Sequence, residues 1–580
     1  MASEIEDRYC QLVKNALKET CVDSANIKVC RKSKDLTQGD FVIPRGVLDI
    51  DLDSETVKAV HLEDTIVRKT ASDVLPMSRL SHDKYNSVIF FIDRKKAFGN
   101  IIQQVLTAGE NYGLQPVGTR ERVIVNPVDL HVCSTQDQSQ APTSLIQLRA
   151  VILLKHVLQL FIFNGYDAEI AQFPATENVQ DLLDALNVET SSSVATDLDK
   201  TCEQLLEKAQ VSSWREELTS NTERDQRKAR EECGDGEKEK NSVVLNLRKY
   251  LADKGLQVGK NGYDKNLNLA NVKLENGTMS DVLREAAVIE LIMSGPGQAG
   301  IPTNAEGSKA VCVHLVSQSL AFTQQQADLI WRVCSPSPVP HALIQRHLVF
   351  GSVGRRKSST SVVLDAKEFY NVRHTQMTQA AMMKYGDHDQ GAAWDDMIAG
   401  LTAASISFDV LSSASSSQVQ LDLSQDEGEG GVDNRSGPFV LYNCARLATL
   451  LQSFEQQVEQ GVYPDLPDPS EIDFGLLREE EEWTLALLYV HGFPRLVQDT
   501  LTSWQQTQGI TAGVQTHKVA HFLLNFAKIL SSYYSRYHVL GGREAHLLPL
   551  MYARLSLVKA AHRVLCNGLR LLGLQPFAQL

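Results

Sequence analysis

Hydrophobic and polar positions follow the period of a helix over the last quarter of this chain. In residues 437–451, GPFVLYNCARLATLL, apolar residues recur at spacings of four, three and four: Val440, Cys444, Leu447 and Leu451. This spacing predicts one buried helix face, and Ser436 and Pro438 are typical of a helix start. The opposite side carries Phe439, Tyr442, Asn443, Arg446 and Thr449. Such a side suits either a contact with another domain or a surface for a planar, anionic ligand.

The pattern upstream of residue 437 alternates between short apolar runs and helical periodicity. The apolar runs predict strands at 87–93, 122–127, 167–173, 309–316 and 347–353. Amphipathic segments predict helices at 4–20, 96–113, 143–164, 324–334 and within 366–411, and everything after 437 has a helical pattern. The strand–helix–strand order from 122 to 173 is typical of a parallel α/β unit.

These elements predict an α/β plus all-α protein in four parts. A small α+β domain covers 1–115, an α/β domain covers 116–411, and a helical domain covers 437–580. Residues 412–436 are rich in Ser, Gly and acids, which predicts a linker with one short strand at most. Residues 213–242 are densely charged, as in a solvated helix or a disordered insertion.

Charge is distributed unevenly along the 580 residues. The net charge of −14 argues against attraction of the whole molecule to nucleic acid or to an acidic membrane, but it permits a local basic patch. Residues 455–482 hold ten acids, including Glu479–Glu482 in a row. Residues 512–580 hold eight Lys or Arg against one acid. We expect no DNA and no membrane among the partners.

Ten cysteines are scattered without a CxxC pair, so the spacing indicates neither zinc nor a disulfide framework. Reduced thiols fit a cytoplasmic protein. The first ten residues lack the apolar core of a signal peptide. The longest apolar run, 150–163, is short for a bilayer and is interrupted by Lys155 and His156, so we expect a buried helix.

Two local motifs lack the context that their chemistry needs. GPGQAG at 295–300 matches a dinucleotide fingerprint, but Pro302 and Gly307 follow it, which predicts a loop and no cofactor. His517 and His521 lie four residues apart, as in zinc proteases, but Lys518 replaces the required glutamate. We expect no metal there.

Several segments together resemble arginyl-tRNA synthetases. GPFVLYNCARLATLL, HKVAHFLLNFAKILSSYYSRYHVL and RLSLVKAAHRVLCNGLRLLGL resemble helices of their anticodon-binding DALR domain, over about 440–575. TQGDF and VIFFIDRKKAFGNIIQQVL resemble their N-terminal domain, which touches the tRNA elbow. RVIVNP with the following helix resembles the class I nucleotide-binding fold. The resemblance implies a degenerate Rossmann-like synthetase domain, a small α+β domain and a helical DALR bundle.

The family's ATP-binding histidines are missing from the matching place. Alignment on Leu148 and Arg149 puts Ser144, Leu145, Ile146 and Gln147 where the family has two histidines around a small pair. Leu and Ile cannot donate the hydrogen bonds that stabilise charge on the reacting phosphate. The resemblance therefore implies a synthetase-like pseudoenzyme without a cofactor.

The family's lysine-rich mobile loop corresponds to GRRKSSTS, 354–361. Arg355, Arg356 and Lys357 keep its positive charge. Three interpretations stay open: an exposed basic loop, a contact with the tRNA acceptor arm, or a working ATP loop.

For a non-catalytic member, the resemblance implies a protein that binds arginine tRNAs and presents them to a tRNA 3-methylcytidine methyltransferase acting in the anticodon loop. Aromatic and arginine planes stack on splayed RNA bases, and cations meet phosphates. The candidate tRNA-binding residues are Tyr442, Asn443, Arg446, Lys518, Tyr533, Tyr534, Arg536, Arg554, Lys559 and Arg563.

The bundle leaves alternatives for these residues. Each tyrosine also suits a core position with its hydroxyl bonded at the rim, and of the adjacent Tyr533 and Tyr534 we expect one buried and one exposed. Glu479–Glu482 suits a solvated helix start or a docking edge for a basic partner. The competing functions are a residual or repurposed synthetase-type adenylating enzyme, and a structural scaffold.

Overall fold

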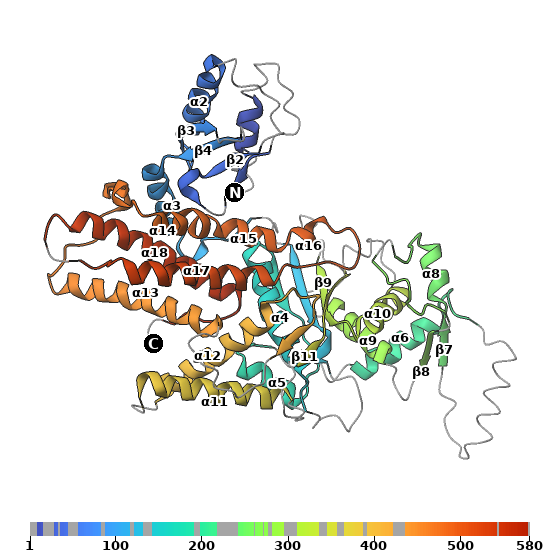
Figure 1. Cartoon of the computed structure of the whole chain (residues 1–580). Coiled ribbons are helices and arrows are strands. Elements are labelled where there is room, and N and C mark those ends of the chain that lie inside the picture. The colour runs from blue at the N-terminus through green and yellow to red at the C-terminus, as the bar shows by residue number, and fades with distance from the viewer. Residues whose placement is uncertain are drawn as a thin grey trace, which may run out of the picture. The chain divides into compact units, whose positions relative to one another are not determined.

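The chain folds into two compact units in a computed structural model, each unit built from separated stretches of sequence (Figure 1). The first unit comprises Met1–Gln115, Asp433–Asp499 and Lys518–Leu580, and the second comprises Pro116–Val432 and Thr500–His517. The residues that the structure describes are 8–15, 28–32, 35–44, 56–82, 87–116, 121–131, 142–190, 198–216, 242–259, 262–270, 272–275, 281–294, 310–335, 345–355, 365–386, 391–421, 436–541 and 544–577.

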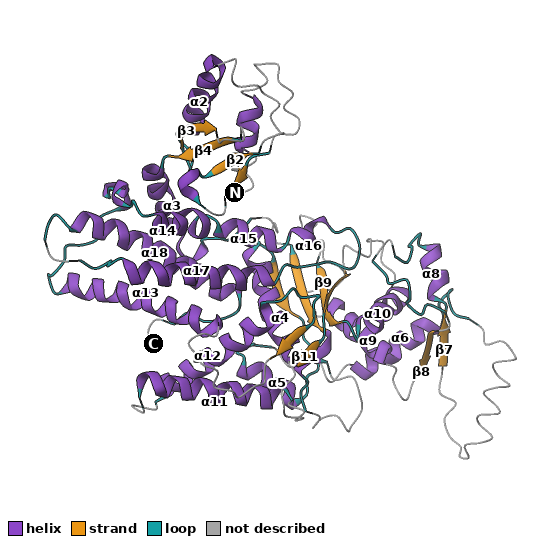
Figure 2. Ribbon diagram, in the orientation of Figure 1, coloured by secondary structure: helices purple, strands orange, loops and turns teal. Residues whose placement is uncertain are grey.

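The N-terminal part of the first unit is an antiparallel sheet with helices, as the α+β prediction expects (Figure 2). Its strand order is β1-β2-β4-β3. The strand expected at 87–93 is confirmed as β4, and Asp93 caps the following helix by accepting a hydrogen bond from the Lys96 amide. The elements are β1 (Cys30–Arg31), β2 (Phe41–Ile43), α2 (Thr56–Thr70), β3 (Met77–His82), β4 (Val88–Ile92) and α3 (Arg94–Ala108).

The C-terminal part of the first unit is a helical bundle. Val440, Cys444 and Leu447 are buried, which confirms the predicted apolar face, whereas Leu451 is half-buried. Because Leu441 and Leu450 are also buried, the apolar face is wider than the spacing alone indicated. The helices are α13 (Ser436–Glu459), α14 (Glu480–Thr484), a π-helix (Leu485–Val490), α15 (Phe493–Thr500), α17 (His517–Arg536) and α18 (Leu548–Leu571).

Trp483 connects the sheet to the bundle within the first unit. Its fully buried indole packs edge-on against Phe98, with ring centroids 5.2 Å apart, and its Nε1 donates a 2.7 Å hydrogen bond to Asp40. Asp40 also accepts a 2.8 Å hydrogen bond from the Ile92 amide. Burial raises the pKa of Asp40 despite these two bonds. A buried acid held by an indole is costly to separate from its donors.

The second unit contains the predicted parallel sheet. Its strand order is β10-β9-β5-β6, with every neighbouring pair parallel. The strand order switches between β5 and β9: from β5 the chain goes to β6 on one side, and then returns to the other side of β5 as β9 and continues to β10. Ligands bind at such switch points in folds of this class. The elements are β5 (Arg122–Pro127), α4 (Leu145–Phe163), β6 (Asp167–Ile170), β9 (Val311–Ser317), α10 (Ala321–Cys334) and β10 (Gln345–Phe350).

The expected buried helix is confirmed as α4, although our length argument was not decisive. With 19 residues it is long and apolar enough by composition to cross a membrane. Its side chains instead fill the core beside the sheet, with Leu148, Leu154, Leu160 and Phe161 fully buried. Such burial is typical of a core helix.

The described residues of the second unit also form further helices and two two-stranded sheets, β7–β8 and β11–β12. Most of the charged segment 213–242 lies outside the described residues, as does GPGQAG at 295–300. The remaining elements are α5 (Glu177–Ala185), α6 (Leu198–Gln210), β7 (Ser242–Leu245), α8 (Leu247–Asp253), β8 (Val272–Glu275), α9 (Asp281–Ser294), β11 (Val353–Arg355), α11 (Ala366–Tyr385), α12 (Ala392–Leu411), β12 (Val419–Leu421) and α16 (Thr502–Gln506).

Two predictions about connecting segments can be compared with the structure. The expected linker carries the one short strand that its pattern allowed, β12, which pairs with β11 and has Val419 and Leu421 buried. Residues 507–516 are not helical, contrary to the pattern after 437. The amides of His347 and Ala512 bond this segment to the edge of β10, at 2.7 and 3.0 Å. Hydrogen bonding to a sheet edge overrode local helix propensity.

A row of buried polar side chains crosses the parallel sheet. Asn126 on β5 and Gln324 on α10 donate hydrogen bonds to His314 Nδ1, at 3.0 and 3.1 Å, while His314 Nε2 bonds to Gln345 on β10. Burial, together with the neighbouring His347, lowers the pKa of His314 to about 3. The imidazole is therefore neutral and fully bonded at physiological pH.

This network predicts loss of stability in acid. The unfolded histidine has a pKa of about 6.5, so between about pH 6.5 and 3 the unfolded chain binds more protons, and stability falls as pH decreases. Between pH 7 and pH 5, the free energy of unfolding should fall by roughly 2 kcal/mol less in His314→Gln than in wild type, because the variant lacks this titrating group. Urea unfolding at the two pH values measures this, with exposed His538→Gln as control. Equal losses in wild type and His314→Gln would contradict the assignment.

Candidate nucleic-acid interface

The four consecutive glutamates at the start of α14 are each bonded to another side chain of the first unit. Glu479 accepts a 2.9 Å hydrogen bond from the Tyr537 hydroxyl, and Glu480 pairs with Arg94 at 2.6 Å. Glu481 pairs with Arg536, and Glu482 accepts 3.0 Å bonds from both Tyr533 and Arg554. We call Glu479–Glu482 the acidic run.

Glu482 is the buried member of the acidic run. Its side chain is 0% exposed and that of Arg554 is 14% exposed, so their ion pair is largely shielded from water. Tyr533 is 1% exposed, and burial followed by the charge of Glu482 raises its pKa. The phenol therefore stays protonated and donates to Glu482. The Arg554 guanidinium also lies over the Tyr537 ring, 5.1 Å from its centroid.

These bonds bear on two expectations. The acidic run forms the expected helix start, because reciprocal bonds between Glu479 and Glu482 cap α14. It is also bonded within the chain, since Glu480, Glu481 and Glu482 pair with arginines and Glu482 is buried. Tyr533, Arg536 and Arg554, expected to contact RNA, are each bonded to one of these glutamates, and their contact with RNA stays a prediction. The structure confirms the expected difference between neighbours, because Tyr533 is buried and Tyr534 is partly exposed.

Three other candidates lie on helices of the bundle in different surroundings. Asn443 is 6% exposed and its amide donates a 2.8 Å hydrogen bond to the Phe439 carbonyl, which gives it a role inside its own helix in place of the expected RNA contact. Tyr442 and Lys518 are half-buried.

Arg446 and Tyr534 come together as a stacked pair. The Arg446 guanidinium lies over the Tyr534 ring, 4.8 Å from its centroid, and Arg446 is exposed. Both line a hollow of about 410 Å³, together with Thr449, Leu450, Ser453, Tyr537, His538, Val539 and Leu540. We call this the Arg446 hollow. An arginine plane and a tyrosine ring beside an opening are the groups on which an unstacked base can rest.

Lys559 and Arg563 line a second hollow, of about 540 Å³, with His562 and Arg570. We call this the Lys559 hollow. Glu110 accepts bonds from Arg563 at 3.4 Å and Arg570 at 2.9 Å, and Arg570 lowers the pKa of Glu110. Lys559 is exposed. The hollow is therefore basic overall, as a phosphate contact needs.

The two hollows lie on opposite sides of α13. Arg446 and Ser453 face the first, whereas Ala448 and Glu455 face the second. Residues two positions apart point about 200° apart around a helix. One helix thus separates an aromatic surface from a cationic one.

The synthetase-like region of the second unit uses its helix start differently from an ATP site. Ser144 Oγ accepts a 3.2 Å hydrogen bond from the Gln147 amide, and Gln147 Oε1 accepts a 2.8 Å bond from the Ser144 amide. This capping box satisfies amides that a phosphate would otherwise bind. The side chains of Leu145 and Ile146 have no donor.

Arg149 ties α4 to the segments that follow β10 and precede β12. Its guanidinium donates to the carbonyls of Gly351 at 2.7 Å, Ser415 at 2.8 Å and Ser417 at 2.9 Å. Burial lowers its pKa to about 10, so it remains charged. Arg355 is the last residue of β11, whereas Arg356 and Lys357 lie outside the described residues, so the acceptor-arm contact stays a prediction.

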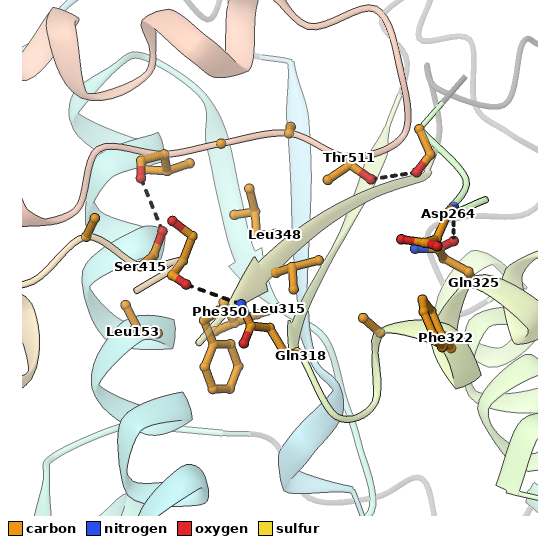
Figure 3. Close-up of a pocket in the computed structure, with 18 of the residues that line it drawn as sticks. Leu153, Asp264, Leu315, Gln318, Phe322, Gln325, Leu348, Phe350, Ser415 and Thr511 are labelled. Atoms are coloured by element: carbon orange, nitrogen blue, oxygen red, sulfur yellow. Dashed lines mark hydrogen bonds between the residues drawn. The ribbon is translucent and has the colours of Figure 1, made fainter. Parts of the chain in front are cut away.

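A cavity of about 850 Å³ lies beside β9 and β10 in the second unit (Figure 3). Leu315, Leu348 and Phe350 form its floor, Leu153 comes from α4, and residues 511–516 border it. Among the described residues that line it, the charged ones are Asp264 and Lys265, and none is a histidine. One lysine beside one aspartate is a poor counter-charge for a triphosphate.

The acidic run and Arg94 are the partners that the sequence analysis missed. The signal was present, because an acidic stretch at 455–482 and a basic stretch at 512–580 have opposite charge in one chain. Opposite charges in one chain attract each other as well as external ligands. We assigned the basic stretch to RNA alone.

The buried ion pair predicts that Glu482→Gln destabilises the bundle. The substitution leaves Arg554 poorly compensated in a shielded site, which costs roughly 3 kcal/mol. Urea unfolding and faster hydrogen exchange in α17 and α18 measure the loss. Glu459→Gln, at an exposed position of α13, serves as control and should change stability by less than about 0.5 kcal/mol. Unchanged exchange in α17 and α18 of the Glu482→Gln variant would contradict the prediction.

Comparison with known proteins agrees with this architecture. Residues 440–580 match the DALR anticodon binding domain. A Thermus thermophilus arginyl-tRNA synthetase structure aligns over 99% of this chain and 100% of its own, with a TM-score of 0.58 and 14% identity, which shows a shared fold. Mouse DALR anticodon-binding domain-containing protein 3 is 38% identical over 325 residues, 56% of this chain and 59% of the relative. The zebrafish protein of that name is 30% identical over 561 residues, 94% of this chain and 92% of the relative. The chain therefore belongs to the family of DALR anticodon-binding domain-containing protein 3.

Proposed function

We propose that this chain is a non-catalytic adaptor that binds arginine tRNAs through its DALR domain and presents them to a tRNA 3-methylcytidine methyltransferase. The arginyl-tRNA synthetase-like fold and the DALR anticodon-binding domain support tRNA binding. The finer assignment rests on the resemblance described above and on the surface around α13. Reduced cysteines in the described part of the chain fit an adaptor that works in the cytoplasm.

The observation that carries the proposal is the Arg446–Tyr534 pair at the edge of its hollow. Stacking of a base on such a group is worth about 1–3 kcal/mol and tolerates sequence variation. Lys559 and Arg563 on the other side of α13 supply cations for phosphates, which orient an RNA without reading its bases. Anticodon loops present both splayed bases and closely spaced phosphates, so the surfaces on the two sides of α13 can serve the two contacts.

The acidic run sharpens this assignment by restricting the RNA surface. Arg536 and Arg554 already have carboxylate partners, and a phosphate would have to replace Glu481 or Glu482 to reach them. Arg446 has an aromatic partner and Lys559 is exposed, so both present charge outward. We therefore assign RNA contact first to Arg446, Tyr534 and Lys559. Arg563 lines the Lys559 hollow as well but is paired with Glu110, so its contact with a phosphate ranks after theirs.

This assignment predicts separable effects on tRNA binding. We expect Arg446→Ala and Tyr534→Ala each to weaken binding of arginine tRNA roughly tenfold, with unchanged folding, because each removes half of the stacking pair. In a plot of the logarithm of the binding constant against the logarithm of the salt concentration, Lys559→Ala should reduce the magnitude of the slope by about one. Filter binding at several salt concentrations measures both effects.

Arg248→Ala, an exposed arginine of α8 in the second unit, controls for loss of one positive charge. Wild-type affinity in both Arg446→Ala and Tyr534→Ala would overturn the surface assignment. Equal binding of arginine tRNAs and other tRNAs by the wild-type chain would overturn the choice of substrate.

The second candidate function is a residual adenylating enzyme, which the synthetase-like fold keeps open. The Ser144–Gln147 capping box and the apolar Leu145 and Ile146 argue against it, because one lost stabilising donor typically costs about 10²–10³ in rate. Two assays on one preparation distinguish the functions. We expect no arginine-dependent ATP–pyrophosphate exchange, and we expect increased 3-methylcytidine formation on arginine tRNA when the chain is added to the methyltransferase. Clear exchange without stimulated methylation would favour the enzyme.

A further inference from the structure

Two cysteines and a histidine meet where α13 packs against α18. Cys444 lies on α13, and His562 and Cys566 lie one turn apart on α18. The Sγ atoms of Cys444 and Cys566 are 3.7 Å apart, and Cys566 Sγ is 3.5 Å from His562 Nε2. All three potential ligand atoms lie within 4.8 Å of one another. Proximity of three soft or borderline donors is the arrangement that zinc uses in proteins.

We propose that Cys444, His562 and Cys566 bind one zinc ion. Zinc lies about 2.3 Å from thiolate sulfur and about 2.0–2.1 Å from imidazole nitrogen, in tetrahedral geometry. Those bond lengths place two sulfur ligands about 3.8 Å apart, and a sulfur and a nitrogen ligand about 3.5 Å apart. The observed separations of 3.7 and 3.5 Å match two of the three edges between the ligands, and the third, between Cys444 Sγ and the imidazole, is within 4.8 Å.

The positions of the three residues suit a bound cation. Cys444 is 0% exposed and Cys566 is 7% exposed, so the two sulfur ligands are held within the packed helix pair. His562 and Cys566 also line the Lys559 hollow, which gives the ion a path from solvent and leaves its fourth position to water. Two thiolates neutralise the double charge of zinc, so the occupied site adds no net positive charge beside Lys559 and Arg563.

A disulfide between Cys444 and Cys566 is the competing chemistry. It would need an oxidant to accept two electrons and two protons, and it would leave His562 without a role. The four-residue spacing of His562 and Cys566 puts the imidazole on the same helix face as the thiol. Three convergent donors favour a metal over a bridge between two of them.

The site would join the two longest helices of the bundle. Cys444 and Cys566 are separated by 122 residues of sequence. A zinc ion bound by both helices stabilises the folded bundle, because it binds the native arrangement in preference to the unfolded chain. The same ion would order His562 beside Lys559 and Arg563. The inference stands without tRNA binding, since it concerns metal affinity alone.

Cobalt substitution tests the site in the full-length chain. The protein is stripped of metal, kept reduced with a phosphine, and titrated with Co²⁺ and then Zn²⁺. We expect one equivalent of Co²⁺ to give thiolate charge-transfer absorption and tetrahedral visible bands, and one equivalent of Zn²⁺ to remove them. Cys444→Ser and Cys566→Ser should abolish the charge-transfer bands, and His562→Gln should weaken Co²⁺ binding at least tenfold.

Cys30→Ser, a partly exposed cysteine of β1 in the same unit, is the matched control and should bind Co²⁺ like wild type. Circular dichroism verifies folding of each variant, and His562→Gln keeps the test decisive if a cysteine variant unfolds, because His562 is partly exposed. Absence of thiolate–cobalt bands in the reduced wild-type chain would overturn the proposal. Bands that persist in His562→Gln with unchanged affinity would overturn it as well, as would a Cys444–Cys566 disulfide that forms in air and excludes metal.

Discussion

The ion pairs of the acidic run, with Arg94 on α3 and with Arg536 and Arg554 on the C-terminal helices, are the constraint on which the first unit depends. Four like charges in sequence repel one another, and they are tolerated here because Arg94, Arg536 and Arg554 meet them. The pair of Glu482 and Arg554 is shielded from water, so water cannot compensate either charge when its partner is removed. Trp483, the next residue, bonds to Asp40 and so anchors the same turn to the N-terminal sheet.

This internal neutralisation changes which groups remain for RNA. A basic stretch that balances acids of its own chain has less charge available to an external ligand. The groups that face outward are those that do not pair with the acidic run. The main example is Arg446, whose guanidinium lies over the Tyr534 ring. Selection of a tRNA by the bundle would then depend more on stacking and loop shape than on total positive charge.

The synthetase-like unit keeps its parallel sheet while its local chemistry serves the fold. Amides at the start of α4 bond to Ser144 and Gln147, and Arg149 bonds to backbone carbonyls. These polar groups at the start of α4 therefore bond within the chain. A shared fold does not fix the function, so a domain of this shape can also position an RNA or a protein partner.

The sequence by itself determined the periodic elements and the fold class. The strand at 122–127, the core helix after it and the apolar face of α13 follow from local patterns, because side-chain burial repeats with the backbone period. It could not place 507–516 on the edge of β10, or join Glu482 to Tyr533 and Arg554, or bring Cys444 to His562 and Cys566. Those contacts link residues far apart in sequence, and only tertiary packing decides which opposite charges and which thiols meet.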